Sequence, residues 1–225
     1  MVLLFDVFGT CVDWRSGVAR DVASLGRELD AGAFADAWRR RYQPSMEEVR
    51  SGRRPFTKLD VLHRESLEAL LPEFGLESLS EAERAWLNLT WHRLDPWPDV
   101  PGGLLKLRER HVTATLSNGN VSLLVDLARH GDLRFDAILS AEVVGAYKPQ
   151  PEAYLRACSL LDVPPAGATL VAAHPDDLAA AARAGLQTAY VARPREWGRP
   201  EDHELPEPGR FGNQLSSLEE LAGIL

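Results

Sequence analysis

The chain opens with MVLLFDVFGTCVDW (residues 1–14), and the sixth residue of this stretch needs an explanation. Val2–Phe5 is a short apolar run, which is typical of a buried strand. Asp6 follows at once, and a turn-prone Gly9-Thr10 pair comes shortly after it. Because a charged carboxylate is costly at the edge of a core, this position indicates that Asp6 does something other than packing.

Five short apolar runs along the chain are strand candidates, and from the second run onward they alternate with helical segments. The predicted strands are residues 2–5, 112–116, 137–139, 169–173 and 188–192. The predicted helices are residues 102–110, 121–130, 152–161, 177–184 and 215–225. Buried strands that alternate with helices indicate a parallel sheet covered on both faces. Residues 193–213 carry four prolines, and we interpret them as one long surface loop.

Residues 15–95 have a different character, since they hold no convincing strand but several helix signatures. Asp30 and Thr57 are predicted N-caps, and Ser80 with Glu83 has the spacing of a capping box. We therefore predict a helical cap domain at residues 15–95. The core domain would then combine residues 1–14 with residues 96–225.

The composition excludes several classes of protein. The chain has 225 residues, of which 45% are hydrophobic and 26% are charged, as in ordinary globular proteins and unlike disordered or fibrous ones. A net charge of −8 argues against a protein that coats nucleic acid or an anionic membrane. Cys11 and Cys158 have no metal-site spacing, so we expect free thiols in a reducing cytoplasm. We expect neither a signal peptide nor a membrane helix, which needs an apolar run of ~18 residues.

Polar residues cluster at the predicted strand ends, where parallel α/β sheets bind their ligands. They are Asp6, Thr10, Ser117, Asn118, Lys148, Tyr154, His174 and Asp177. Taken singly, each of them except Asp6 is explained as well by a turn, a cap or a surface loop. Taken together, their order at successive strand ends makes coincidence the weaker explanation.

Four motifs now carry a family resemblance: FDVFGT (5–10), LSNG (116–119), YKPQPEAY (147–154) and AAHPDDLAAA (172–181). Together they resemble the haloacid dehalogenase superfamily, and more narrowly its L-2-haloacid dehalogenase (type II) branch. The similarity extends over essentially the whole chain, including AWRRRY (37–42) and GRRPF (52–56). It implies a Rossmann-like α/β core of parallel strands with an inserted all-helical cap over a nucleophilic Asp6. It implies neither a metal ion nor an organic cofactor.

Within the family that the chain resembles, the residue two positions after the nucleophile distinguishes phosphatases from dehalogenases. Phosphatase members carry a second Asp two residues after the nucleophile, which protonates the leaving group, and they use Mg²⁺. Here that position is Phe8, and a halide needs no proton to leave. The implied reaction is displacement of halide from an (S)-2-haloalkanoic acid by the Asp6 carboxylate. Water then hydrolyses the aspartyl ester to a 2-hydroxy acid.

The resemblance also assigns supporting roles around the nucleophile. Lys148 is expected to keep Asp6 ionised and oriented, and Thr10 and Ser117 are expected to donate hydrogen bonds to it. The predicted catalytic residues are Asp6, Thr10, Lys148, His174 and Asp177.

The predicted substrate-binding residues are Cys11, Arg39, Phe56, Ser117, Asn118 and Tyr154. The substrate carboxylate is expected against backbone N–H groups of the 10–11 and 117–118 loops. Arg39 and Asn118 are the expected halide ligands, and Phe56 is an expected apolar wall. Two more arginines follow Arg39, but neighbouring helical residues point about 100° apart, so we expect only one of the three to face inward.

The fourth motif departs from the better-known dehalogenases, in which a Ser and an Asn position the hydrolytic water. Ala172 and His174 stand at those positions here, while Asp177 is retained. Two hypotheses remain open. Either His174 is the general base for the water, or it only orders its loop while Asp177 and Lys148 organise the water.

Two other functions stay as alternatives at this point. One is a phosphatase of the same superfamily that acts on a small phosphate ester, with Asp176 and Asp177 holding Mg²⁺. The other is a non-catalytic relative that binds a small acid or a protein partner. Phe8 argues against the first, and the intact nucleophile set argues against the second. The expected partner is a small halogenated carboxylic acid; since relatives are commonly dimers, a homodimer is a further open expectation.

Overall fold

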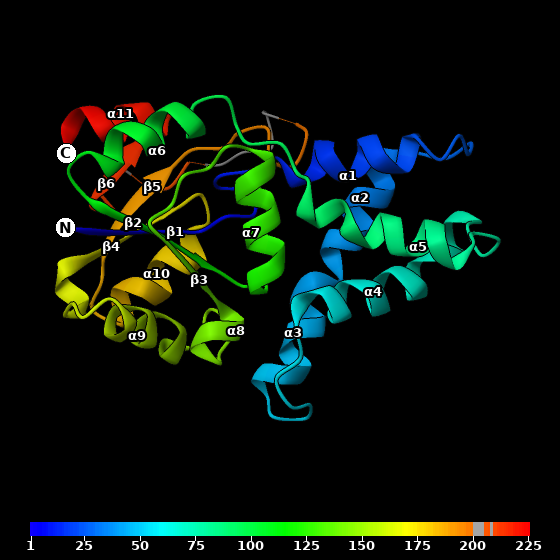
Figure 1. Ribbon diagram of the computed structural model, residues 1–225, viewed down its shortest axis with the longest axis horizontal. Coiled ribbons are helices and arrows are strands. Elements are labelled where there is room, and N and C mark those ends of the chain that lie inside the picture. Colours follow the sequence, from blue (N-terminus) through cyan, green and yellow to red (C-terminus); the bar gives the residue numbers. More distant parts are fainter. Residues whose placement is uncertain (200–204, 208) are drawn as a thin grey trace.

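The computed structural model describes residues 1–199, 205–207 and 209–225, and its centre is a sheet of six strands (Figure 1). The strand order is β3-β2-β1-β4-β5-β6, and every pair is parallel. The strands are β1 (Val2–Phe5), β2 (Val112–Ser117), β3 (Ala137–Ser140), β4 (Ala168–Ala172), β5 (Gln187–Val191) and β6 (Asn213–Leu215). The predicted Rossmann-like α/β fold is confirmed.

The central strand, β1, is fully buried and pairs with β2 on one side and β4 on the other. Burial on both faces explains why its sequence is a continuous apolar run rather than an alternating one. The Asp6 N–H donates to the Val171 carbonyl oxygen at 3.0 Å, which extends the ladder by one residue. Asp6 therefore stands at the carboxyl edge of the sheet, where β1 and β4 end together.

Helices cover both faces of the sheet and separate two apolar clusters. The cluster containing Leu3 and Phe5 packs against α6 (Val100–Arg108), α7 (Val121–His130) and α11 (Leu218–Ile224). The cluster containing Val2 and Leu4 packs against α9 (Pro151–Leu160) and α10 (Pro175–Arg183). The short helix α8 (Ala141–Val144) follows β3, and the 3₁₀ turn η3 (Pro165–Gly167) precedes β4. Adjacent residues of β1 thus face opposite layers, as strand geometry requires.

The chain between β1 and α6 is helical, as predicted, and lies beside the sheet (Figure 1). It contains α1 (Trp14–Ala23), α2 (Ala31–Arg40), α3 (Tyr42–Arg50), α4 (Leu59–Leu70), η1 (Leu71–Phe74), α5 (Glu81–Asn88) and η2 (Leu89–His92). The predicted Asp30 cap and Ser80 capping box are confirmed. The Thr57 cap was wrong: Lys58 precedes α4, and the Thr57 hydroxyl instead donates to the Pro55 carbonyl oxygen. The division at residues 15–95 stays a prediction.

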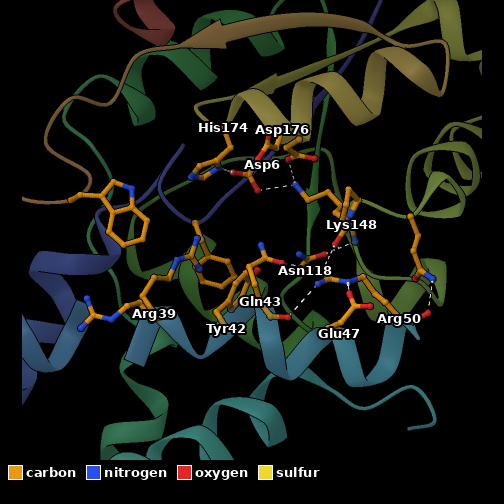
Figure 2. Close-up of a pocket in the computed structure, with 16 residues that line it drawn as sticks. Asp6, Arg39, Tyr42, Gln43, Glu47, Arg50, Asn118, Lys148, His174 and Asp176 are labelled. Carbon is orange, nitrogen blue, oxygen red and sulfur yellow. Dashed lines mark hydrogen bonds and ion pairs between the residues drawn. The ribbon is translucent and has the colours of Figure 1, made fainter. Parts of the chain in front are cut away.

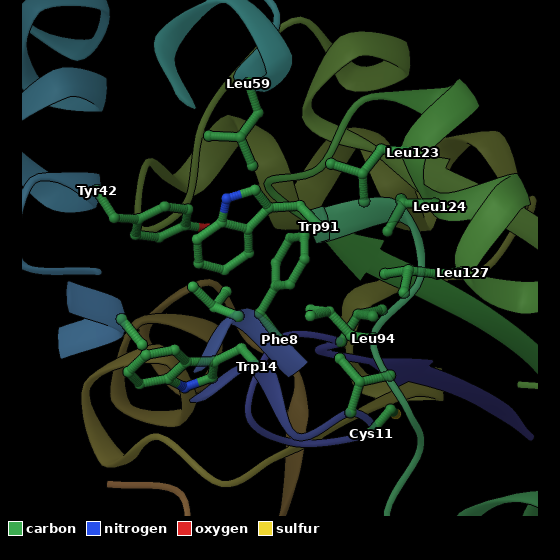
Figure 3. Packing of buried hydrophobic residues seen from close by; sticks show 14 of the residues in the cluster. Phe8, Cys11, Trp14, Tyr42, Leu59, Trp91, Leu94, Leu123, Leu124 and Leu127 are labelled. Carbon is green, nitrogen blue, oxygen red and sulfur yellow. The ribbon is translucent and has the colours of Figure 1, made fainter. Parts of the chain in front are cut away.

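One apolar cluster joins the helical insert to the sheet, and Phe8 lies within it (Figure 3). The Phe8 ring meets Trp91 edge to face at 5.9 Å and Tyr42 at 6.4 Å between centroids. Trp14 also stacks on Trp91, with 6.5 Å between the ring centroids. Because large aromatic rings bury much apolar surface, this cluster fixes how the insert sits over Asp6. Phe8 is therefore a packing residue in the position where a phosphatase carries its acid.

The strand β6 was not predicted. Residues 193–213 were interpreted as a loop running into a helix at 215, but Asn213–Leu215 pairs with β5 and α11 begins at Leu218. Three residues, two of them amides, give no apolar run for a pattern to detect. Part of that predicted loop, residues 200–204 and 208, lies outside the described residues. Among the described residues, no helix is long and apolar enough to cross a membrane.

Candidate active site

Three side chains, those of Thr10, Lys148 and His174, converge on the Asp6 carboxylate at the carboxyl edge of the sheet. Figure 2 shows Lys148 and His174 beside Asp6. Lys148 Nζ donates to Oδ1 at 2.8 Å, and Thr10 Oγ1 donates to Oδ2 at 2.7 Å. His174 Nδ1 lies 3.0 Å from the same Oδ2. Burial alone would raise the pKa of Asp6, but Lys148 and His174 outweigh it and hold that pKa below its usual range. Asp6 is therefore a buried carboxylate that stays ionised.

Lys148 is held by hydrogen bonds from both its backbone and its side chain. Its backbone N–H donates to Asn118 Oδ1 at 2.8 Å, and its ammonium also donates to Asp177 Oδ2 at 2.5 Å. Tyr154 donates to the other Asp177 oxygen at 2.5 Å. Burial opposes the charge of Lys148, but Asp177 and Asp6 raise its pKa above the usual range. A permanent cation thus lies between the two carboxylates.

His174 bridges two carboxylates, and the second one comes from an unexpected place. Its Nε2 lies 3.0 Å from Glu196 Oε1, and the Trp14 indole N–H donates to that same oxygen at 2.9 Å. Burial would lower the pKa of His174, but Glu196 and Asp6 raise it to about 10. In the resting protein the ring therefore carries a proton on both nitrogens.

Glu196 was missed because it lies in a turn without any periodic pattern. The strand-end rule that selected the other residues would have pointed to it, since the turn follows β5. Arg193 anchors this turn by donating to the Thr10 carbonyl oxygen at 2.9 Å and by forming two hydrogen bonds with Asp99. Gly9 has a φ of +84°, and a Cβ there would lie 2.1 Å from Glu196 Oε1. Only glycine lets the loop after Asp6 and the Glu196 side chain come this close.

A cavity of about 740 Å³ lies between the sheet edge and the helical insert. Asp6, Asn118, Lys148 and His174 line it from the sheet side, and Arg39 and Tyr42 line it from the insert (Figure 2). The position of Asn118 is set by the Lys148 N–H bound to its Oδ1. The cavity therefore has the ionised Asp6 beside Lys148 and His174 on one wall, and a cationic and an aromatic group, Arg39 and Tyr42, on the other.

Arg39 is the notable residue of the insert wall. Its guanidinium carbon lies 4.2 Å from the centre of the Tyr42 ring and 5.3 Å from that of Trp14. Its Nη1 is buried and has no hydrogen-bond partner among the described residues. The expectation of a single inward arginine was wrong in one respect, because Arg40 also borders the cavity while Arg41 pairs with Glu73. An unpartnered buried donor is the kind of group that binds an anion.

The structure does not bring every predicted residue to the cavity. The Cys11 N–H donates to the Val7 carbonyl oxygen and its thiol donates to the Asp6 carbonyl oxygen, so that amide is not free for a substrate carboxylate. Phe56 is 39% exposed and stacks on Tyr147 rather than lining the cavity. The Ser117 hydroxyl accepts a hydrogen bond from Gly119 N–H at 3.2 Å. The assigned roles of these three residues stay predictions without geometric support.

Comparison with known proteins identifies the family of the chain. The model of the haloacid dehalogenase-like hydrolases matches residues 1–185, and the chain belongs to that family. Within it, (S)-2-haloacid dehalogenase 1 of Pseudomonas sp. (strain CBS-3) is 31% identical, over 99% of this chain and 95% of the relative. (S)-2-haloacid dehalogenase 4A of Burkholderia cepacia is 29% identical, over 99% and 93%.

Two solved structures are closely similar along their whole length. The L-2-haloacid dehalogenase PA0810 is 46% identical with a TM-score of 0.94, covering 99% of this chain and 98% of that one. The defluorinating L-2-haloacid dehalogenase Rha0230 is 42% identical with a TM-score of 0.96, covering 100% and 94%. The resemblance inferred from the four motifs is confirmed.

Proposed function

We propose that this protein hydrolyses (S)-2-haloalkanoic acids to 2-hydroxy acids through an ester formed on Asp6. The observation that carries the proposal is an ionised carboxylate facing a cavity, with the packed ring of Phe8 where phosphate chemistry would need an acid. Relatives 29–46% identical over nearly the whole chain are (S)-2- or L-2-haloacid dehalogenases, which supports the same activity.

In the first step, an Asp6 oxygen forms a bond to C2 of the substrate as the carbon–halogen bond breaks. The halide leaves with the bonding electron pair, and the configuration at C2 inverts. Lys148 and Thr10 hold the nucleophile in place, so little reorganisation is needed on the way to the transition state. We assign halide binding to Arg39, through its unpartnered Nη1, and to the amide nitrogen of Asn118.

In the second step, water attacks Cγ of the Asp6 ester, and the alkyl oxygen leaves as the hydroxyl of the product. We assign the general base to His174, because its Nδ1 faces Asp6 from 3.0 Å. Asp177 is less suited to organise water, since its two oxygens already accept from Lys148 and Tyr154. The phosphatase alternative is disfavoured by Phe8, whose packed ring offers no proton to a leaving group.

Halide release from the two enantiomers of 2-chloropropionate tests the proposal. We expect chloride from the (S) acid, (R)-lactate as the product and no release from the (R) acid. Fluoroacetate belongs in the same assay, because one relative with 42% identity is described as defluorinating. Phosphatase activity that requires Mg²⁺, without halide release, would contradict the proposal.

We also propose that the enzyme works in the cytoplasm as a homodimer. Both cysteines are free and buried, which suits a reducing compartment. Light scattering on the purified protein and fractionation of the producing cell test the two statements.

A further inference from the structure

We propose that Glu196 is a positioning residue that holds His174 for hydrolysis of the Asp6 ester. The proposal rests on the proposed function and adds to it a carboxylate that lies 190 residues from the nucleophile in the sequence and next to it in the fold. Glu196 does not contact Asp6 itself; it acts through the imidazole that separates them.

The imidazole of His174 lies between the Glu196 carboxylate and Asp6, where the reaction takes place. Both Glu196 oxygens lie within 3.1 Å of His174 Nε2, and the Trp14 indole N–H donates to one of them, Oε1, which holds the carboxylate in place. A carboxylate on one ring nitrogen keeps the proton there and leaves the other nitrogen free to take a proton at the reaction centre. Here the nitrogen that faces the reaction centre is Nδ1.

The fold is built to keep Glu196 in this place. Only 4% of the residue is exposed, and glutamate is almost never buried to that extent unless it is paired. The turn that carries it is anchored by Arg193 at one end, and Trp197 packs on Trp14 at 5.0 Å at the other. The missing Cβ of Gly9 leaves the space that its carboxylate fills.

The charges around His174 change during the reaction. In the resting protein the His174 ring pairs with Asp6 and Glu196. Lys148 pairs with Asp6 and with Asp177 behind it, and Asp176 lies in the first turn of the helix that follows His174. The positive charge of Arg39 helps to lower the pKa of Glu196. Two adjacent carboxylates raise the pKa of His174 to about 10, so the ring is protonated at first. Ester formation neutralises Asp6, which lowers the pKa of His174 and lets the ring lose a proton to solvent. Among the described residues, Glu196 then remains as the only anionic group in contact with the ring.

His174 carries one proton through the hydrolytic step. Neutral His174 takes a proton from water through Nδ1 while the water oxygen bonds to Cγ of the ester. The Cγ–O bond to the alkyl group breaks, and the departing oxygen takes that proton from His174. The new Asp6 carboxylic acid passes its proton back to His174, which restores the resting state. The one net proton of the reaction is the one released after ester formation.

Glu196→Gln tests the proposal, because it keeps the size of the side chain and its acceptor for Trp14 but removes the charge. Its amide also donates to Nε2, which favours the wrong tautomer of His174. We expect halide release of one equivalent per site to persist in a rapid-quench experiment. Hydrolysis of the ester should slow by about 10²-fold, so the Asp6 adduct accumulates in the intact mass. The acidic limb of the hydrolysis rate should move to lower pH.

Two variants complete the experiment. Glu196→Asp keeps the charge one methylene shorter and should recover part of the hydrolysis rate. Glu65→Gln removes a carboxylate that pairs with Arg54 on the insert and should match the wild type in both steps. Equal slowing of halide release and ester hydrolysis in Glu196→Gln, or hydrolysis at the wild-type rate with an unmoved acidic limb, would overturn the inference. A wild-type protein that releases no halide would instead overturn the proposed function.

Discussion

Two histidines in this protein each lie between two carboxylates, and only one of them faces a cavity. His174 bridges Asp6 and Glu196 at the sheet edge. His92 bridges Asp60 of α4 and Asp126 of α7, at 3.0 and 2.7 Å, where the insert meets the core. Their local electrostatics are alike, because the pKa of both is raised by carboxylates against the effect of burial.

The difference between the two sites lies in what surrounds them. Asp6 is almost fully buried and lines the cavity, whereas the Asp126 side chain is 57% exposed and the His92 pair ties helices together. Asn120 adds to the second site by donating to Asp60 at 2.8 Å. A shifted pKa therefore shows that a charge is buried or paired, but it does not show a catalytic role by itself. Of these two histidines, we expect catalysis only from the one beside the cavity, where a substrate can reach it. Changing each site in turn should separate catalysis from stability.

The largest expected effect is the loss of the nucleophile. Asp6→Asn should lower halide release by about 10⁴-fold or more, since an amide cannot form the ester. Asp60→Asn, the matched change at the His92 site, should leave the rate within about twofold. Ion chromatography of released chloride measures both. Substantial turnover by Asp6→Asn would remove the distinction between the two sites.

The next effect concerns the two histidines themselves. His174→Ala should leave the first displacement intact and slow ester hydrolysis by about 10²-fold to 10⁴-fold, so that the ester on Asp6 accumulates. His92→Ala should instead lower the free energy of unfolding by about 1–3 kcal/mol, because it removes the ring that pairs with both Asp60 and Asp126. Intact mass after a quench, and urea unfolding, measure the two outcomes. If no ester accumulates in His174→Ala, the base assignment fails.

The smallest expected effect is the pH dependence of stability at His92. Burial would lower the pKa of His92, but hydrogen bonds to Asp60 and Asp126 raise it above 6.5 in the folded protein. Its contribution is therefore fully present below about pH 6.5 and is lost as the pH rises through the higher folded value. The pKa of Asp60 is lowered, despite its burial, by hydrogen bonds and charge from His92, so its contribution is present above the unfolded pKa of about 3.8 and is lost as the pH falls through the lower folded value.

This pH dependence can be tested by comparing unfolding of the wild type with that of a variant that lacks the His92 ring. The difference in unfolding free energy between the wild type and His92→Gln should be largest near roughly pH 5–6 and should shrink on the alkaline side. Urea unfolding at several pH values measures it. A difference that grows with rising pH would show that His92 is neutral in the folded state.

The sequence predicted the central sheet and most of the residues that meet around Asp6, because the signals for them are local. Buried strands are apolar runs, and the residues that follow β1, β2 and β4 can be placed by the strand-end rule. Glu196 and β6 escaped because neither a turn nor three residues of mostly amide character carries a pattern. Phe56 was placed by resemblance alone, and its position depends on stacking with Tyr147, a residue 91 positions away. A short stretch of sequence carries no signal for packing between residues so far apart in the chain.

A single turnover in H₂¹⁸O, with enzyme in excess over (S)-2-chloropropionate, tests the covalent role of Asp6 most directly. If water attacks Cγ of the ester, one ¹⁸O enters the side chain of Asp6, and the new hydroxyl of lactate carries the unlabelled oxygen that Asp6 supplied. Peptide mass spectrometry of residues 1–15 and of the product reads both. Label found in the lactate hydroxyl and absent from Asp6 after that one turnover would mean that water attacks the substrate itself, and the ester mechanism would be wrong.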